Sequence, residues 1–348
     1  MSHPYSDLPA RAFWRSAVAE ADRAQFAGLY TPRVAITAGT AVATAGSCFA
    51  QHIGTYLRIA GCKVLDAERP LQAMSDKIAK RFGYGLFSGR YGNIYTARQM
   101  CELLEDVQSG HLDPAHVWDK GQGFVDAFRP TIEPDGLDSV EEVLLHRTHH
   151  LIRLAAMLER ADVFIFTLGL TECWQHRTTG RTYPVCPGVA AGTFDPDLHQ
   201  FHNYTHAEVL ADLHRLHDLL RRFNPQMALV LTVSPVPLTA TATDAHVLNV
   251  TSQSKATLRA AAGAFIAASE NTDYIPSYEI ITAPASGGPW FESNMRSVAP
   301  AGVEKVMQIV LAAHGLIEAA PADPASPLPD DADDDLVCED LLLQSFAK

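Results

Sequence analysis

Residues 44–54 of this 348-residue chain read TAGSCFAQHIG, where a short apolar run ends in a glycine, a serine follows, and a helical pattern begins. Small and β-branched residues before Gly46 indicate a strand, and the apolar spacing after Ser47 indicates a helix that ends at Gly61. A strand that passes directly into a helix presents the residue at the turn above the edge of the sheet. Ser47 is therefore either a nucleophile at this edge or the cap of the helix that follows.

The same alternation of strands and helices continues along the chain. ADVFIFTLGLTE (161–172) and MALVLTVSP (227–235) are typical of strands buried on both faces, and the segment 272–280 is expected to be a further strand. Helical patterns fall between and after these strands, at 97–108, 138–160, 205–225, 250–270 and 300–314. This order predicts an α/β fold with a mostly parallel sheet, helices on both faces, and ligands at the carboxyl ends of the strands.

Composition and charge limit the classes of function. With 47% apolar and 19% charged residues the chain can bury a large core, and we expect a single domain over 1–317 with an N-terminal lead-in. The net charge is −13, and nine acidic residues with one lysine lie between 318 and 348. Lysine and arginine never form a run, so we expect no nucleic-acid partner. The Pro-rich acidic stretch 318–335 is predicted to be a linker, and 336–348 a short helix that docks on the domain or on a protein partner.

Cysteine usage and hydropathy predict where the protein is located and give no sign of a metal site or a membrane span. The six cysteines form no CxxC pair, which favours reduced thiols and gives no reason to expect a metal or another cofactor. No signal peptide and no apolar run of about eighteen residues is visible, so we expect a cytoplasmic protein without a membrane span.

Five stretches resemble, in the same order, the signature blocks of the GSCFA family, which is grouped with the SGNH or GDSL-like hydrolases and acyltransferases. They are GSCFA (46–50), YGNIYTARQ (91–99), FTLGLTECW (166–174), TVSPVPLTAT (232–241) and PSYEI (276–280). The resemblance covers about residues 35–315, most of the chain. It implies a flavodoxin-like, three-layer α/β/α fold of the SGNH hydrolase type with an ester-handling site along one edge of the sheet.

The first two blocks carry the expected nucleophile and its helpers. By resemblance Ser47 is the nucleophile, and its own backbone amide is one donor to the oxyanion hole. Gly92 and Asn93 come together before a helix, where an amide and a carboxamide would both point at an oxyanion. A Gly-Asn turn that merely leads into the helix is the alternative for this pair.

The third block departs from the superfamily pattern. Its GLTE stands where Gly-x-Asn-Asp is common, so Gly169 is kept while Thr171 and Glu172 replace the amide and the acid. The Thr171 hydroxyl would donate to the oxyanion, and Glu172 would orient a base or a substrate hydroxyl. An exposed loop glutamate is the alternative for Glu172.

The last block lacks the superfamily's acid and histidine. Asn294 and Ser297 stand at these positions, and no histidine lies between His246 and His314, so Ser47 lacks its usual base. Candidates for that base are Glu172, Glu292 or a histidine from elsewhere, with His202 in the site we predict and His149, His150, His176, His206 and His246 as further candidates.

Two residues are expected to contact the substrate. Arg296, at the entry to the last helix, would clamp a carboxylate or phosphate of the substrate, unless it forms a surface salt bridge. Ser234 offers a hydroxyl on a Pro-rich loop at the rim of the pocket.

The function we expect is that of a serine esterase or O-acyltransferase with a small-molecule or saccharide ester as substrate. The resemblance implies that the substrate is an acetyl ester and that the protein takes part in the modification of bacterial polysaccharides. The alternative is a carbohydrate- or ligand-binding protein that has the same fold and no Asp-x-x-His pair.

Overall fold

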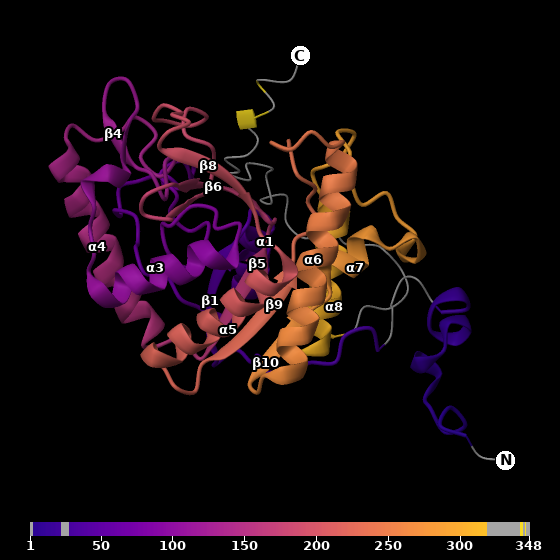
Figure 1. Ribbon diagram of the computed structural model, residues 1–348. Coiled ribbons are helices and arrows are strands. Elements are labelled where there is room, and N and C mark those ends of the chain that lie inside the picture. The colour runs from indigo at the N-terminus through magenta and orange to yellow at the C-terminus, as the bar shows by residue number, and fades with distance from the viewer. Residues whose placement is uncertain (1–2, 22–27, 319–341, 344, 346–348) are drawn as a thin grey trace.

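Five parallel strands form the centre of the molecule (Figure 1). In spatial order they are β2 (Lys63–Val64), β1 (Ala41–Gly46), β5 (Val163–Leu168), β9 (Ala228–Val233) and β10 (Thr272–Ile275). Numbered by their place in the chain, these strands run 2-1-3-4-5, which is the flavodoxin-like order. The predicted α/β fold is therefore confirmed in this computed structural model.

The three central strands are apolar because both of their faces are covered. Every residue of β1, β5 and β9 is buried, as expected for a parallel sheet between two layers of helices. Their pairing sets Gly46 level with Thr167, and Thr167 level with Thr232. The loops that follow the three strands consequently leave the sheet side by side.

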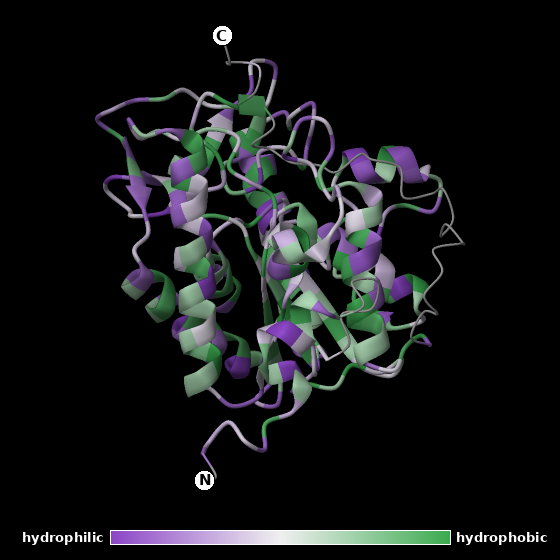
Figure 2. Cartoon of the chain, turned by 90° about the vertical axis from the view of Figure 1, so that its right-hand side faces the viewer, coloured by the Kyte–Doolittle hydropathy of each residue, from purple (hydrophilic) through white to green (hydrophobic). Residues whose placement is uncertain are grey.

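Helices cover the two faces with separate cores. On one face α3 (Ala97–Ser109), α4 (Val140–Leu158), α5 (His206–Phe223) and α6 (Val247–Ala268) pack around Phe164, Phe166 and Leu231. On the other face α1 (Phe49–Ile59), α7 (Ser277–Thr282) and α8 (Pro300–Ala313) pack around Ile165 and Val230. Alternate residues of the same strand thus enter different cores, because side chains of a strand point to its two faces in turn. Hydropathy colouring shows the result, with green strands inside and helices of mixed green and purple (Figure 2).

The helix boundaries follow signals in the sequence. Thr96 caps α3 through a capping box with Gln99, and α5 ends at Phe223, just before Asn224-Pro225. One expected element is wrong in part: the strand predicted at 272–280 ends at Ile275, and Ser277–Thr282 form α7. A further short helix, α2 (Asp76–Arg81), lies outside the alternating pattern.

Two small antiparallel sheets are added to the central one. β3 (Val117–Asp119) pairs with β4 (Phe124–Asp126). β6 (Glu172–His176) pairs with both β7 (Thr182–Tyr183) and β8 (His199–Asn203). We call the segment 172–203, which carries β6, β7 and β8, the inserted sheet; it stands between β5 and α5 in the chain and above β1 and β5 in Figure 1.

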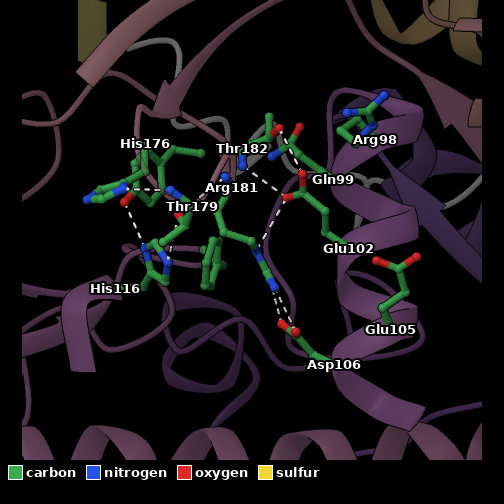
Figure 3. Close-up of polar contacts among 12 residues, drawn as sticks. Arg98, Gln99, Glu102, Glu105, Asp106, His116, His176, Thr179, Arg181 and Thr182 are labelled. Carbon is green, nitrogen blue, oxygen red and sulfur yellow. Dashed lines mark hydrogen bonds and ion pairs between the residues drawn. The ribbon is translucent and has the colours of Figure 1, made fainter. Parts of the chain in front are cut away.

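Buried ion pairs join the inserted sheet to α3 (Figure 3). Arg181, beside β7, donates to both carboxylate oxygens of Asp106, at 2.7 and 2.5 Å. Glu102, one helical turn away, accepts bonds from the Thr182 amide at 2.9 Å and the Thr182 hydroxyl at 3.2 Å. Burial raises the pKa of Glu102 to about 7. Paired charges with several hydrogen bonds hold this sheet in one position on the domain.

The described residues are 3–21, 28–318, 342–343 and 345. Nearly all of the predicted linker (318–335) and of the predicted C-terminal helix (336–348) lies outside them. The end of the lead-in packs on the domain, since the Tyr30 hydroxyl donates to Asp273 on β10 at 3.0 Å. Within the described ranges no helix is both long enough and apolar enough to span a membrane.

Candidate active site

Ser47 stands at the turn between β1 and α1, as the sequence predicts. Gly46 has φ of 138°, and a Cβ at this position would lie 2.7 Å from the backbone nitrogen of Thr167, so the turn requires a glycine. The Ser47 carbonyl accepts a bond from the Ala50 amide at 2.8 Å, which starts the first turn of the helix. No side chain caps α1, so the reading of Ser47 as a simple cap is not supported.

The Ser47 hydroxyl faces a small cavity. The residue is 2% exposed, and in the part of the chain that the structure describes its Oγ is buried and has no hydrogen-bond partner. The cavity measures about 10 Å³ and is also lined by Gly169, Ser234 and Arg296. That space holds about one water molecule. Residues of the loop 234–238 and Arg296 form part of the wall of this cavity.

Two backbone amides expected in an oxyanion hole have other partners. The Ser47 amide donates to the Thr167 carbonyl at 3.1 Å, which extends the pairing of β1 with β5 by one residue. The Gly169 amide donates to the Tyr95 carbonyl at 2.9 Å. Neither amide is available for an oxyanion in this conformation, so these two expected donors are not supplied.

The Gly92-Asn93 block lies directly against the Ser47 turn. The amide of Ile94 donates to the Gly46 carbonyl at 2.9 Å, and Gly92 has φ of 67°, which favours glycine. Asn93 is 1% exposed. The structure therefore brings this block next to Ser47, although Tyr95, and neither Gly92 nor Asn93, lines the cavity.

Gly169 provides room beside the serine. A Cβ at this position would lie 3.1 Å from the Ser47 Cβ and 3.0 Å from a ring carbon of Tyr95. The Gly169 carbonyl accepts a bond from the ammonium of Lys255 on α6 at 2.5 Å, and Lys255 is 2% exposed. The sequence offers Lys255 as a contact for an anionic group of the substrate, whereas the structure places it on the Gly169 carbonyl. Its position on the apolar stripe of α6, three residues before Leu258, is the signal for its burial.

Thr171 and Glu172 point away from the Ser47 cavity. The amide and hydroxyl of Thr171 both donate to the hydroxyl of Ser254, at 3.0 and 3.1 Å, so Thr171 anchors its loop to α6. Glu172 begins β6, is 8% exposed, and accepts a bond from the Thr241 hydroxyl at 2.7 Å. Burial raises the pKa of the Glu172 carboxyl. The alternative of an exposed loop glutamate is wrong, because Glu172 is part of a buried strand.

No imidazole is placed at the serine. His202 lies on β8, and its Nε2 is 2.9 Å from a carboxylate oxygen of Glu208 in the first turn of α5. Of the residues with described positions, no histidine lines the Ser47 cavity. The structure therefore places His202 in a hydrogen bond with Glu208, and of the described histidines none occupies the position of a general base at Ser47.

The segment that replaces the superfamily's acid and histidine directs Arg296 inward. The Asn294 carboxamide oxygen accepts bonds from the amides of Arg296 and Ser297, both at 2.9 Å, and its nitrogen donates to the Ser297 hydroxyl at 3.0 Å. Arg296 is 8% exposed and lines the Ser47 cavity, so its side chain is buried and does not lie on the surface. Ser234 lines the same cavity, where its hydroxyl accepts the Val236 amide at 3.2 Å.

A second, much larger pocket adjoins the Ser47 cavity. It has a volume of about 630 Å³, and Tyr95, Leu170 and Leu238 line both spaces. Glu172 lies in its wall. Among the residues that the structure describes, no group of three His, Cys, Asp or Glu side chains is arranged to hold a metal ion.

The chain belongs to the GSCFA family, whose pattern matches residues 41–309. The resemblance of the five sequence blocks is thereby confirmed. A search of curated proteins finds no match.

Two solved structures are similar at low identity. One is a putative GDSL-like lipase from Parabacteroides merdae, 14% identical, covering 82% of this chain and 100% of that one with a TM-score of 0.35. The other is an acetyl xylan esterase from the rumen bacterium Butyrivibrio proteoclasticus, 11% identical, covering 83% and 67% with a TM-score of 0.32. Similarity at this level indicates no function for this chain.

Proposed function

We propose that this chain is a serine-dependent esterase or acyltransferase in which Ser47 accepts an acyl group from an ester. The observation that carries the proposal is the buried Ser47 hydroxyl, which has no partner among the described residues and faces a cavity at the carboxyl ends of the central strands. A buried polar atom is normally bonded, and exceptions are frequent at functional sites.

Arg296 and the start of α1 supply the electrostatics of the reaction. When the Ser47 oxygen bonds to the carbonyl carbon of an ester, negative charge develops on the carbonyl oxygen. The guanidinium of Arg296 lines the same cavity and stays protonated at any physiological pH. The first amides of α1 add the positive end of a helix dipole. These groups take over the role that the engaged amides of Ser47 and Gly169 do not fill.

The proton of Ser47 sets the expected rate. As the new C–O bond forms, the hydroxyl proton passes through a water in the cavity to the alcohol that leaves. Without a histidine at this position acylation is slow, since general base catalysis contributes about 10²- to 10⁴-fold. Esters whose leaving alcohol is acidic are therefore the best substrates. The family resemblance further supports a saccharide as acceptor, and a cytoplasmic setting and a role in polysaccharide modification belong to the same proposal.

A ligand-binding protein is the second candidate. It is favoured by Asn294 and Ser297, which stand at the positions of the acid and histidine and bond to each other. In this reading the cavity and the adjoining pocket hold a ligand, and no bond is broken.

Covalent labelling separates the two candidates. The protein is incubated with a fluorophosphonate, which forms a bond with an activated serine hydroxyl, and in parallel with p-nitrophenyl acetate. We expect both reactions in the native chain, loss of both in Ser47→Ala, and no loss in Ser252→Ala, where an exposed hydroxyl on α6 is removed. An unlabelled native protein that releases nitrophenol no faster than Ser47→Ala would refute the enzyme and favour the binding protein.

A further inference from the structure

The pocket beside the Ser47 cavity is large enough for a substantial ligand. Its volume of about 630 Å³ lies within the range of about 300–1,000 Å³ that is usual for small-molecule sites. The acetyl group expected from the sequence would leave almost all of it empty. A longer chain would fill much more of this volume than acetyl does.

The lining indicates an uncharged, apolar occupant. Trp174, Phe194 and Phe201 contribute aromatic rings from the inserted sheet. Of the described residues that line the pocket, none is a lysine, arginine or histidine, and Glu172, bonded to Thr241, is the single carboxylate. An anionic head group would find no cation in these walls, whereas a hydrocarbon chain would contact mostly apolar side chains.

The pocket adjoins the Ser47 cavity. Tyr95, Leu170 and Leu238 each line both the pocket and the Ser47 cavity, so the two spaces are separated by no more than these shared side chains. A carbonyl carbon at Ser47 would have its substituent directed past them. The ion pairs of Arg181 with α3 hold the inserted sheet, and with it the aromatic wall, in place.

We propose that this pocket binds the acyl tail of a medium- or long-chain ester whose carbonyl is positioned at Ser47. The assignment rests on the function proposed above and revises its expected acyl group from acetyl to a longer chain. Each methylene moved from water into such a pocket improves binding by about fourfold, which follows from the free energy of burying one CH₂. The gain continues until the pocket is filled.

Two fluorophosphonates of different length test the proposal. The labelling rate of the full-length protein is measured with an ethyl and with a decyl fluorophosphonate. We expect the decyl reagent to label Ser47 at least a hundredfold faster. In Ala240→Trp, which places an indole at the pocket wall, the ratio of the two rates falls at least tenfold; in Ala245→Trp, on the same exposed loop but outside the lining, it does not change.

The outcomes distinguish the two proposals. If neither reagent labels Ser47, the proposed enzyme fails. If both reagents label at equal rates, the enzyme stands and the acyl pocket is refuted. If the ratio of decyl to ethyl labelling rates is the same in Ala240→Trp as in the native chain, the decyl chain binds elsewhere and the acyl pocket is also refuted.

A binding measurement tests the pocket without any reaction. Ser47→Ala protein is titrated with 1-decanol, an uncharged chain, and tryptophan fluorescence is followed, because Trp174 lies in the wall. We expect saturable binding that Ala240→Trp weakens at least tenfold. Absence of saturable binding would overturn the proposal. A Leu343→Asp variant that binds decanol more than tenfold more tightly would also overturn the proposal. It would show that Leu343, which lines the pocket, competes with the ligand as the pocket's own occupant.

Discussion

Replacing Gly169 by alanine should separate the reactivity of Ser47 from the stability of the fold. The added methyl would lie 3.1 Å from the Ser47 Cβ and 3.0 Å from the Tyr95 ring, so each neighbour must move by a few tenths of an ångström. Overpacking of this kind costs about 1–3 kcal/mol. The smaller entropy of the unfolded chain offsets about 0.4–1 kcal/mol of this, since the φ of Gly169 is not in the left-handed region. The net loss of stability is about 0–2.6 kcal/mol.

The effect on reactivity should be larger. A misplacement of about 1 Å costs on the order of 10²-fold in rate, so a shift of a few tenths of an ångström should slow labelling of Ser47 by about tenfold. Urea unfolding measures the stability, and the rate of fluorophosphonate labelling at 25 °C measures the reactivity. Gly39→Ala is the control, since Gly39 is exposed and its added methyl would meet only Thr37 Oγ1, at 3.9 Å. A Gly169→Ala protein that is labelled within twofold of the native rate would refute the claim that this glycine makes room for the serine.

Two more perturbations address the charges and the missing base. Burial raises the pKa of Glu102 from 4.5 to about 7, so between these two pH values the folded chain keeps a proton that the unfolded chain loses. The free energy of unfolding therefore falls as pH rises from about 4.5 to about 7, by roughly 3 kcal/mol at most. Urea unfolding at pH 5 and pH 8 should therefore show Glu102→Gln gaining stability relative to the native chain as pH rises. An equal change in the stability of both proteins between the two pH values would contradict the raised pKa of Glu102. The double variant Asn294→Asp with Ser297→His supplies an acid and an imidazole one residue from Arg296, and hydrolysis of p-nitrophenyl acetate should rise by about 10²-fold or more. The rise should disappear when Ser47→Ala is added, and an unchanged rate in the double variant would show that this segment is not positioned to serve as base.

The central sheet could be predicted because its strands are unbroken apolar runs. Residues such as those of β5 and β9 are buried on both faces, and few other structures require that pattern over six residues. The inserted sheet was missed for the opposite reason. β8 reads HQFHN, in which four of five residues are polar, and nothing in its local pattern separates such a short strand from a loop.

The position of Ser47 at the turn could be predicted from the sequence, but the hydrogen-bond partners at the site could not. A glycine and a serine between a strand and a helix define the turn from local sequence alone. Which carbonyl the Ser47 amide meets depends on the register between β1 and β5, and that register is set by packing across the sheet. Lys255 illustrates the same limit, because its bond to the Gly169 carbonyl joins segments 86 residues apart.

Ser47 and the aromatic wall of the larger pocket belong to different sheets, which affects how the proposed activity would diverge. The turn at Ser47 is part of the parallel sheet, where a change in one strand disturbs both of its neighbours. The aromatic wall belongs to the inserted sheet, a separate unit fastened to α3 at Arg181. Substitutions in that unit can alter the length or shape of the accepted substrate while the reacting centre stays as it is. In the proposed function, new selectivity is thus accessible through a separate sheet from the one that positions Ser47.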